Sequence, residues 1–364
     1  MHFTDVMTLR PKRATMRDVA EATGLSAAAV SYALRGLHLP EKTLERVRQA
    51  ADELGYEVNP TARALALGRT GTIGVLCSSL EDLWQQRLVV ELGRALLGHE
   101  RFPLVADAQG DPNRERTMVQ QLRDRHVDAA IVVPLDPAAP YWADLIRALP
   151  VVTIGDPLRG VETAGEVLFD NRRAIGLGLA HLADLGHRRV ALLSPSLPLT
   201  PERPAERLAH VEAARLGLEL TLTSSPASVD GAAVVAAQLL TEPVAPTAFF
   251  CLSDSIAYGV YLAVAERGWT VPAQVSVLGY DDHQMSRLLN PPLSTFRWDV
   301  EHIVAAAVPR VLSAAEDAAR PASAAQPHGH AAGTRRSTLR ADLRVRGSTT
   351  VVRTSGTARP SANR

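Results

Sequence analysis

The spacing of hydrophobic and polar residues changes character near Thr72. Before it, between Thr15 and Leu54, apolar residues recur at helical intervals in three short amphipathic stretches. After it, short and almost wholly apolar runs alternate with longer amphipathic stretches. The first such runs are 73–76, 129–133 and 151–154. Apolar strands separated by helices are typical of parallel sheets with helices on both faces, so the pattern predicts an all-α headpiece followed by a larger α/β region.

A second set of apolar runs predicts that the α/β region has two parts. The runs of this set are 190–193, 248–251 and 275–278. Two sets predict two doubly wound lobes, each with its own parallel sheet. Ligands of such sheets bind outside the carboxyl ends of the strands, so we expect a binding cleft where the two lobes face each other.

Composition limits what the chain can bind and where it acts. The 364 residues include 39 basic and 39 acidic side chains, so any nucleic-acid surface must be local. The two cysteines, Cys77 and Cys251, lie in apolar runs, which favours a reducing compartment. The first residues lack the apolar core of an export signal, and no apolar run is long enough to cross a bilayer. We therefore expect a cytoplasmic protein without a membrane partner.

The headpiece has the residues that a helix-turn-helix requires. Gly24 can adopt the positive φ of a tight turn, with the small Ala20 before it and the apolar Val30 after it. Thr15 and Ser26 are placed to cap the first and second helices. In this motif the second helix lies in the major groove, and its early residues face the base edges.

Residues 15–69 closely resemble the DNA-binding headpiece of the lactose-repressor (LacI/GalR-type) family of transcription regulators. The matching stretches are 16–21, 24–26, 29–31, 47–56 and 59–60. The resemblance implies that Ala27, Ala28 and Tyr32 hold base-reading positions. The two alanines offer only methyl contacts, such as those to thymine, so Tyr32 is the early residue that can read a base edge with a polar group.

A short helix is expected in the connector behind the headpiece. Asn59 can cap it, Pro60 suits its first position, and the following residues favour helix up to Gly68. Because so short a helix is marginal alone, the resemblance implies that it forms against the dimer partner on DNA, with Leu65 wedged into the minor groove. The full set of candidate DNA-contacting residues is Thr15, Arg17, Ser26, Ala27, Ala28, Ser31, Tyr32, Asn59, Ala62, Arg63 and Leu65.

The resemblance continues with lower identity to about Thr349 and implies lobes with the fold of periplasmic sugar-binding proteins. The stretches that carry it are 169–171, 186–190, 207–209, 276–282, 291–295 and 346–349. By motif match, Arg207 and Asp281 correspond to ligand-contacting residues, and Ser253 stands where an asparagine is usual. An arginine opposite a carboxylate suits the vicinal hydroxyls of a sugar or the edge of a nucleobase.

Aromatic residues for ligand stacking are few in this interpretation. Trp84 follows the first strand and can stack on a sugar face, or it can be an ordinary core or surface residue. Gly155, the pair at 210–211 and Pro226 depart from the family pattern at cleft positions. We therefore expect an atypical small ligand rather than a typical hexose, or none.

These patterns predict the following division of the chain. We expect a helix-turn-helix domain at 1–57, a hinge at 58–70, a ligand-sensing and dimerisation domain at 71–350, a flexible insertion at 316–335 and a disordered tail at 351–364. Within the sensing domain we assign 71–170 and 299–315 to an N-lobe, and 171–298 and 336–350 to a C-lobe. A final edge strand is expected at 339–346.

Taken together, these features predict a transcription repressor. It is a homodimer that binds double-stranded, pseudo-palindromic operator DNA and responds to a small-molecule effector, sugar or nucleoside-like. No catalytic or metal-ligating motif is found, so we expect no cofactor, no metal site and no enzymatic activity. One alternative is a small-molecule binding protein without a DNA role, which leaves residues 15–69 unexplained. Another is a doubly wound enzyme, which requires a catalytic constellation.

Overall fold

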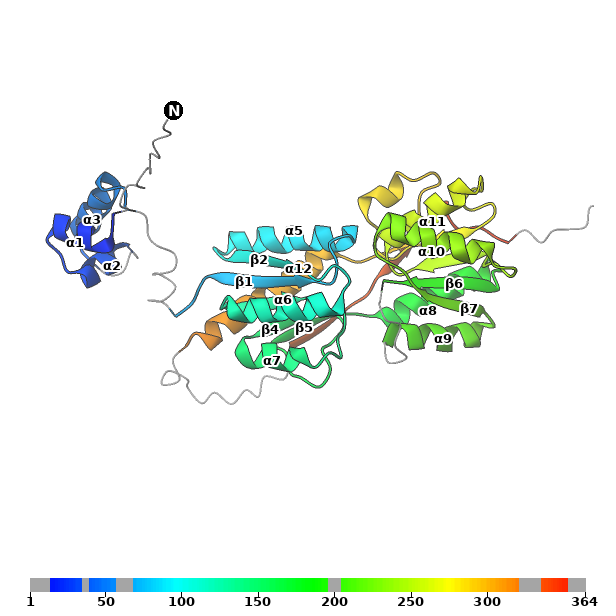
Figure 1. The fold of residues 1–364 in the computed structure, drawn as a ribbon, viewed down its shortest axis with the longest axis horizontal. Coiled ribbons are helices and arrows are strands. Elements are labelled where there is room, and N and C mark those ends of the chain that lie inside the picture. The colour runs from blue at the N-terminus through cyan, green and yellow to red at the C-terminus, as the bar shows by residue number, and fades with distance from the viewer. Residues whose placement is uncertain (1–13, 35–38, 57–67, 196–203, 321–334, 353–364) are drawn as a thin grey trace, which may run out of the picture. The chain divides into compact units, whose positions relative to one another are not determined.

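Two units make up the computed structural model, residues 1–70 and 71–364 (Figure 1). The residues that the structure describes are 14–34, 39–56, 68–195, 204–320 and 335–352. The N-terminal unit contains three helices in its described part: α1 (Met16–Thr23), α2 (Ala27–Leu34) and α3 (Glu41–Glu53). They pack around Val19, Val30 and Val47, each fully buried.

Local hydrogen bonds explain where the first two helices begin. The Thr15 side chain accepts a hydrogen bond from the Asp18 backbone N at 3.4 Å, and the Thr15 backbone N donates to the Asp18 carboxylate at 2.7 Å. The Ser26 hydroxyl accepts from the Ala29 backbone N at 3.2 Å. Gly24 lies between the two helices with φ +62°, a backbone conformation that glycine adopts without strain. Both predicted caps and the predicted turn are confirmed.

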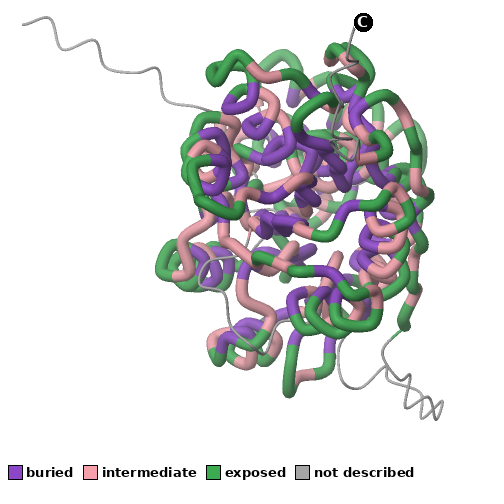
Figure 2. Tube along the Cα trace, turned by 90° about the vertical axis from the view of Figure 1, so that its right-hand side faces the viewer, coloured by how far each residue is buried: buried purple, intermediate pink, exposed green. Residues whose placement is uncertain are grey.

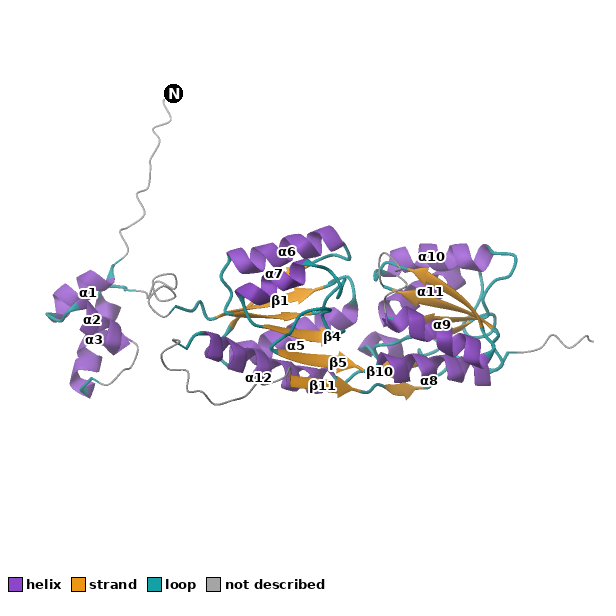
Figure 3. Ribbon diagram, turned by 90° about the horizontal axis from the view of Figure 1, so that it is seen from below, coloured by secondary structure: helices purple, strands orange, loops and turns teal. Residues whose placement is uncertain are grey.

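The N-lobe of the larger unit is a six-stranded parallel sheet. Its strand order is β11 (Arg335–Leu339), β5 (Gly165–Phe169), β4 (Val151–Gly155), β3 (Ala129–Val132), β1 (Thr72–Cys77) and β2 (Phe102–Asp107). Helices α5 (Leu83–Gly98) and α12 (Val300–Ala318) cover one face, and α6 (Pro112–Asp124) and α7 (Tyr141–Ala148) cover the other (Figure 3). Burial on both faces accounts for the continuous apolar strands.

The C-lobe repeats this layering on a four-stranded parallel sheet. Its order is β7 (Glu219–Ser224), β6 (Arg189–Ser194), β8 (Ala248–Cys251) and β9 (Ser276–Leu278). Helices α8 (Asn171–Asp184) and α9 (Pro204–Leu216) lie on one face, and α10 (Val229–Thr241) and α11 (Asp254–Glu266) on the other. Strands β6, β8 and β9 lie in buried segments, the edge strand β7 is partly exposed, and the outer faces of the helices are exposed (Figure 2). The predicted fold class, a helical headpiece with two doubly wound lobes, is confirmed.

Three chain segments join the two lobes. The first follows β5 and leads into α8, and the second runs from β10 (Thr295–Arg297) to α12. The third runs from β11 to β12 (Asp342–Arg344), which pairs antiparallel with β10. The short 3-10 helix η1 (Gln284–Arg287) lies between β9 and β10.

The prediction for the end of the sensing domain is wrong in one respect. The sequence pattern places residues 336–350 in the C-lobe, but β11 pairs in parallel with β5 and forms the edge of the N-lobe sheet. The Arg336 guanidinium also contacts the Glu166 carboxylate at 2.5 Å. The strand expected at 339–346 is therefore divided at the lobe crossing, where alternation of apolar residues continues across two separate strands. The insertion expected at 316–335 is wrong at both ends, because α12 continues to Ala318 and β11 begins at Arg335. Residues 321–334 lie outside the described part.

Close packing of α10 against α11 depends on Gly259. A Cβ atom at this position would lie 2.5 Å from the Val229 carbonyl oxygen and 2.8 Å from the Ala233 backbone N. We expect Gly259→Ala to lower the free energy of unfolding by about 2–3 kcal/mol, because backbone cannot move aside as a side chain can. Urea denaturation measures the change.

Gly176 in α8 provides the matched control for this substitution. Its nearest neighbour would be 3.8 Å from an added Cβ. Gly176→Ala should therefore stabilise the protein by about 0.5–1 kcal/mol through helix propensity. Equal effects of the two alanine substitutions would contradict the packing argument.

Candidate functional site

Helix α2 presents a small, largely uncharged surface to solvent. Ala27 and Ala28 are exposed and Tyr32 is 50% exposed, whereas Val30 and Ala33 are buried against the other two helices. The helix contains no charged residue. The side of α2 that would enter a groove is therefore available, with Ser31 half-buried at its margin.

The other candidate DNA contacts divide into two groups. Thr15, Arg17 and Ser26 lie at the starts of α1 and α2, where side chains can reach phosphates beside the groove. The hinge candidates lie outside the described residues. They are Asn59, Ala62, Arg63 and Leu65.

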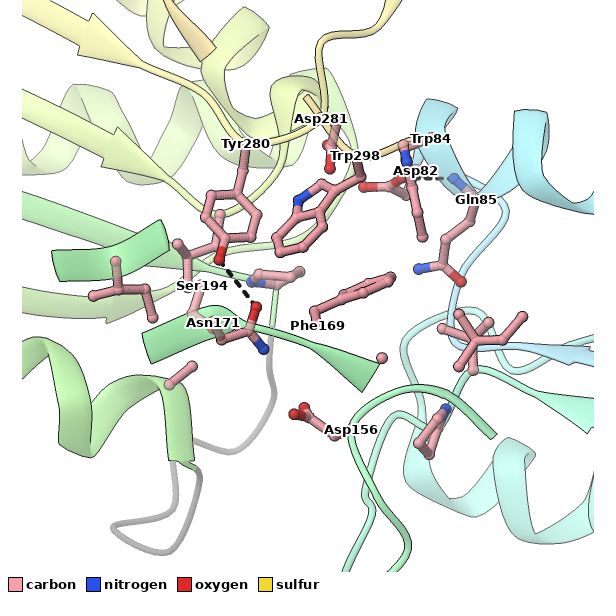
Figure 4. Close-up of a pocket in the computed structure, with 18 of the residues that line it drawn as sticks. Asp82, Trp84, Gln85, Asp156, Phe169, Asn171, Ser194, Tyr280, Asp281 and Trp298 are labelled. Carbon is pink, nitrogen blue, oxygen red and sulfur yellow. Dashed lines mark hydrogen bonds between the residues drawn. The ribbon is translucent and has the colours of Figure 1, made fainter. Parts of the chain in front are cut away.

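A cavity of about 170 Å³ lies between the two lobes of the larger unit (Figure 4). It is bounded by residues that follow the carboxyl ends of strands from both sheets, as expected for doubly wound lobes. Its lining side chains include those at the starts of α5, α8 and α9, at the ends of β4, β5 and β6, and in the segments after β9 and β10.

Four aromatic side chains form a continuous wall of this cavity. Phe169 and Trp298 stack with ring centroids 4.5 Å apart, and Trp84 contacts Phe169 edge-on at 5.6 Å. Tyr280 meets Trp298 at 5.6 Å and donates a hydrogen bond from its hydroxyl to Asn171 at 3.0 Å. The expectation that stacking surfaces are few is therefore wrong. Phe169, Tyr280 and Trp298 were missed because they lie in segments that join the lobes or that reach the cleft from late in the sequence.

Acidic side chains lie around the aromatic wall. The carboxylates of Asp82, Asp156, Glu206 and Asp281 all line the cavity. In Figure 4, Asp82 and Asp281 lie together near Trp298, and Asp156 lies across the cavity from them. Among the described lining residues there is no lysine, arginine or histidine.

Asp82 and Ser253 connect the lobes at the edge of the cavity. The Ser253 hydroxyl donates to Asp82 Oδ2 at 2.5 Å, and the Leu83 backbone N donates to the Ser255 hydroxyl at 3.1 Å. Asp82 also caps α5 by accepting from the Gln85 backbone N at 3.0 Å, and Ser253 caps α11. The two helix N-termini thus share one buried hydrogen-bond network.

Burial changes the protonation of this network. Loss of solvation raises the pKa of the Asp82 carboxyl above its ordinary value, against the hydrogen bond from Ser253, which lowers it. Burial also raises the pKa of Asp281 well above its ordinary range, and the neighbouring carboxylates Asp82 and Asp254 add to this rise. Two carboxyl groups so placed resist being charged together.

Asp254 holds the segment that carries Asp281 and Tyr280. It is 1% exposed, and its Oδ1 accepts from the Tyr280 backbone N at 2.8 Å and from the Thr295 hydroxyl at 2.5 Å. Further bonds come from the backbone N of Asp281 and of His283 and from the Ser286 hydroxyl. Asp254 therefore fixes the shape of the loop after β9, and Ser253 rather than Asp254 is the N-cap of α11.

Glu115 holds the opposite wall in a similar way. It is fully buried, and its carboxylate accepts hydrogen bonds from the backbone N of Leu135 at 2.5 Å and of Asp136 at 3.1 Å, and from the Tyr141 hydroxyl. These bonds fix the loop after β3, which places Val133 and Pro134 at the cavity. Burial raises the pKa of Glu115, and the three donated hydrogen bonds oppose that rise.

The structure brings some of the four predicted ligand residues together and not others. Trp84 and Asp281 line the cavity, and Ser253 is buried behind Asp82. Arg207 is exposed on α9 and does not line the cavity, which differs from the prediction. Successive residues of a helix point about 100° apart, so the inward side chain at this turn is Glu206.

Several lining residues were missed from the sequence. Phe169, Asn171 and Trp298 lie beside the first two lobe crossings, and the sequence located those crossings without assigning their side chains to the site. The signal was available, since a segment that passes between lobes must border the cleft between them. No sequence signal identified Glu206, because the direction of its side chain depends on the residue at which α9 begins.

Substitution of Ser253 tests the shared network between the lobes. Ser253→Ala removes the donor to Asp82 and the cap of α11, so we expect the free energy of unfolding to fall by about 2 kcal/mol. Ser228 is the N-cap residue of α10 but makes no capping hydrogen bond through its side chain. Ser228→Ala should cost less than about 0.5 kcal/mol. Thermal unfolding of both variants measures the difference, and equal losses would contradict a role for the Asp82 contact.

Family models match both units of the chain. Residues 15–59 match the model of "Bacterial regulatory proteins, lacI family", and residues 179–349 match a "Periplasmic binding protein-like domain". No helix within the described ranges is long and apolar enough to cross a membrane, and no group of three potential metal ligands occurs in them.

Similar proteins extend over most of the chain. The ribose operon repressor of Haemophilus influenzae is 28% identical over 78% of this chain and 86% of that protein. The HTH-type transcriptional regulator PtxS of Pseudomonas plecoglossicida is 30% identical over 93% of this chain and 96% of its own length. The crystal structure of the Lac repressor dimer bound to operator and the anti-inducer ONPF has a TM-score of 0.76 and 26% identity, and covers 93% of this chain and all of that one.

Proposed function

This chain belongs to the lacI family of bacterial regulatory proteins, and we propose that it represses transcription as a homodimer on a pseudo-palindromic operator, under the control of a small molecule in the interlobe cavity. The observation that carries this proposal is the surface of α2. Its early residues Ala27 and Ala28 are exposed, and the buried side of the helix is fixed to α1 and α3. The protein would act in the cytoplasm, where bacterial DNA lies.

Operator recognition by this surface relies on shape and methyl contacts more than on hydrogen bonds. Ala27 and Ala28 suit thymine methyl groups, and Tyr32 adds a hydroxyl that can reach a base edge. Arg17 and the hinge residue Arg63 are candidates for phosphate contacts, and Leu65 for insertion into the minor groove. A two-fold dimer would present two copies of α2 to two half-sites, which accounts for a pseudo-palindromic target.

The effector proposal rests on the cavity. An aromatic wall beside several polar acceptors suits a polyhydroxylated ring, because the apolar face of the ring stacks and its hydroxyls donate. Among related proteins, one is a ribose operon repressor, and the Lac repressor dimer has been solved with operator and the anti-inducer ONPF. Closure of the lobes on such a ligand would change the relation between the two N-lobes of a dimer. A coupling of about 1–3 kcal/mol is enough to change operator occupancy.

The two other hypotheses receive less support. A small-molecule binding protein without a DNA role has no use for an exposed α2 on a fixed three-helix unit. For the enzyme hypothesis, the similar proteins are a repressor and a transcriptional regulator rather than enzymes. We infer a regulatory rather than a catalytic role.

Selection of duplexes from a random DNA pool tests the function and identifies the operator at the same time. The full chain should enrich a pseudo-palindromic sequence, and its affinity for that sequence should exceed its affinity for unrelated DNA by at least about 10³-fold. Fluorescence anisotropy at fixed salt measures both affinities. Absence of any enriched sequence from a folded, dimeric preparation would contradict the proposal.

A further inference from the structure

The charges around the interlobe cavity exclude one class of ligand. Four carboxylates line it, and no described lining residue is basic. A phosphate or carboxylate group in this cavity would face these acidic side chains, with no cation among the described lining residues to compensate for lost hydration. Sugar phosphates and sugar acids are therefore poor candidates.

Among the described residues, three of these carboxylates accept hydrogen bonds from neutral groups alone. Glu206 Oε1 accepts from the Ser194 hydroxyl at 3.0 Å, and Asp281 Oδ2 accepts from the Asp254 backbone N at 2.8 Å. Asp82 accepts from Ser253 and from the start of α5. Within the described ranges no salt bridge involves Glu206, Asp281 or Asp82. No basic side chain of the described residues is therefore paired with them.

Glu206 gives the sharpest indication of a missing partner. Its side chain lines the cavity and is 3% exposed, and Oε2 has no hydrogen-bond partner among the described residues. A buried carboxylate oxygen without a donor costs free energy, which a ligand donor would recover. Its pair oxygen is already held by Ser194, so the orientation of the carboxylate is fixed in advance of binding.

The aromatic wall favours the same kind of ligand group. Trp298 and Tyr280 lie beside Asp281, and the face of an aromatic ring attracts a cation. Burial raises the pKa of both Asp82 and Asp281, so a cation between them would favour their charged forms. The carboxylates and the ring faces both select positive charge, and no basic side chain among the described lining residues opposes it.

We propose that the effector is an amino sugar, a polyhydroxylated ring that carries a protonated amine paired with the Glu206 carboxylate through its unpartnered oxygen. This inference rests on the proposed function of the cavity as the effector site. The ring stacks on the aromatic wall and its hydroxyls donate to the remaining acceptors. The amine distinguishes this ligand from the neutral sugar of the same shape.

Matched pairs of sugars test the proposal on the full chain. Isothermal titration calorimetry would compare glucosamine with glucose, galactosamine with galactose and mannosamine with mannose, with glucose 6-phosphate as the anionic probe. At least one amine should bind at least about 10-fold more tightly than its hydroxyl partner, because a charge-assisted hydrogen bond is about twice as strong as a neutral one. The phosphate should not bind.

Substitutions that keep shape and remove charge give the second readout. Glu206→Gln should reduce the preference for the amine about 10-fold, with a smaller effect on the neutral sugar. Glu212→Gln is the matched control, since Glu212 lies on the same helix, outside the lining residues, and pairs with Arg215 at 2.7 Å. If Glu206→Gln fails to fold by circular dichroism, Glu206→Asp provides the comparison, because it keeps the charge but withdraws the carboxylate by one methylene and should also weaken the amine preference.

Several results would overturn the inference. These are tighter or equal binding of the neutral sugar in every pair, binding of the phosphate, no binding of any amine, or an amine preference unchanged by Glu206→Gln. Operator binding measured on the same preparation separates the two proposals. A chain that binds its selected DNA but no amine retains the regulatory function and loses the amino-sugar assignment, whereas a chain that selects no DNA loses the function itself.

Discussion

Replacement of Ala28 by glutamate should weaken operator binding by at least about 100-fold, or about 2.7 kcal/mol, and leave the headpiece folded. Ala28 is exposed on α2, and the adjacent core residues Val30 and Val47 are buried elsewhere on the helices. A dimer would bring two added negative charges against the duplex, where each faces phosphates and loses hydration. Fluorescence anisotropy with the selected operator measures the loss.

Ala22→Glu is the matched control for this variant. Ala22 is also an exposed helical alanine, near the end of α1, so the residue change and the change in net charge are identical. We expect its operator affinity to stay within about 3-fold of the parent. If Ala28→Glu bound as tightly as the parent, α2 would not be the helix in the groove.

The second large effect concerns stability. Asp254→Ala should lower the free energy of unfolding by at least about 4 kcal/mol, because it leaves five donors of the segment after β9 without their acceptor. A loss of this size is a large part of the total stability of a typical domain. The same variant should abolish effector binding, since Asp254 fixes the loop that carries Asp281 and Tyr280. Urea denaturation and calorimetry measure the two losses.

Asp230 offers the comparison for this result. It lies in the first turn of α10, as Asp254 lies in the first turn of α11, but Asp254 is buried and Asp230 is not. Asp230→Ala should cost less than about 1 kcal/mol, the contribution of a carboxylate near a helix N-terminus. Similar losses for both variants would show that the hydrogen bonds of Asp254 contribute little.

The layered fold follows from the sequence because its physical cause is local. Runs such as 129–133 and 248–251 are apolar throughout. A continuous apolar run of this length is typical of a strand that is covered on both faces. The turn at Gly24 and the caps at Thr15 and Ser26 depend on residues within one helical turn. These features were predicted correctly because each depends on neighbours in the chain.

The cavity was less predictable because its residues meet only in three dimensions. Trp298 and Phe169 are far apart in the sequence and stack at 4.5 Å only after both sheets have formed. Whether Glu206 or Arg207 faces the cavity depends on the rotation of α9 about its axis, which no local sequence pattern specifies. The assignment of β11 to the C-lobe failed for the same reason, since pairing with β5 spans the distance from residue 165 to residue 339.

The three connections between the lobes limit how those lobes can move. A pair of bodies joined at one point can swivel in any direction, whereas joints after β5, before α12 and after β11 hold them at three places. Sliding and twisting would stretch at least one joint, so hinge bending is the motion that three joints oppose least. We therefore expect a bound ligand to move the lobes mainly by opening and closing them.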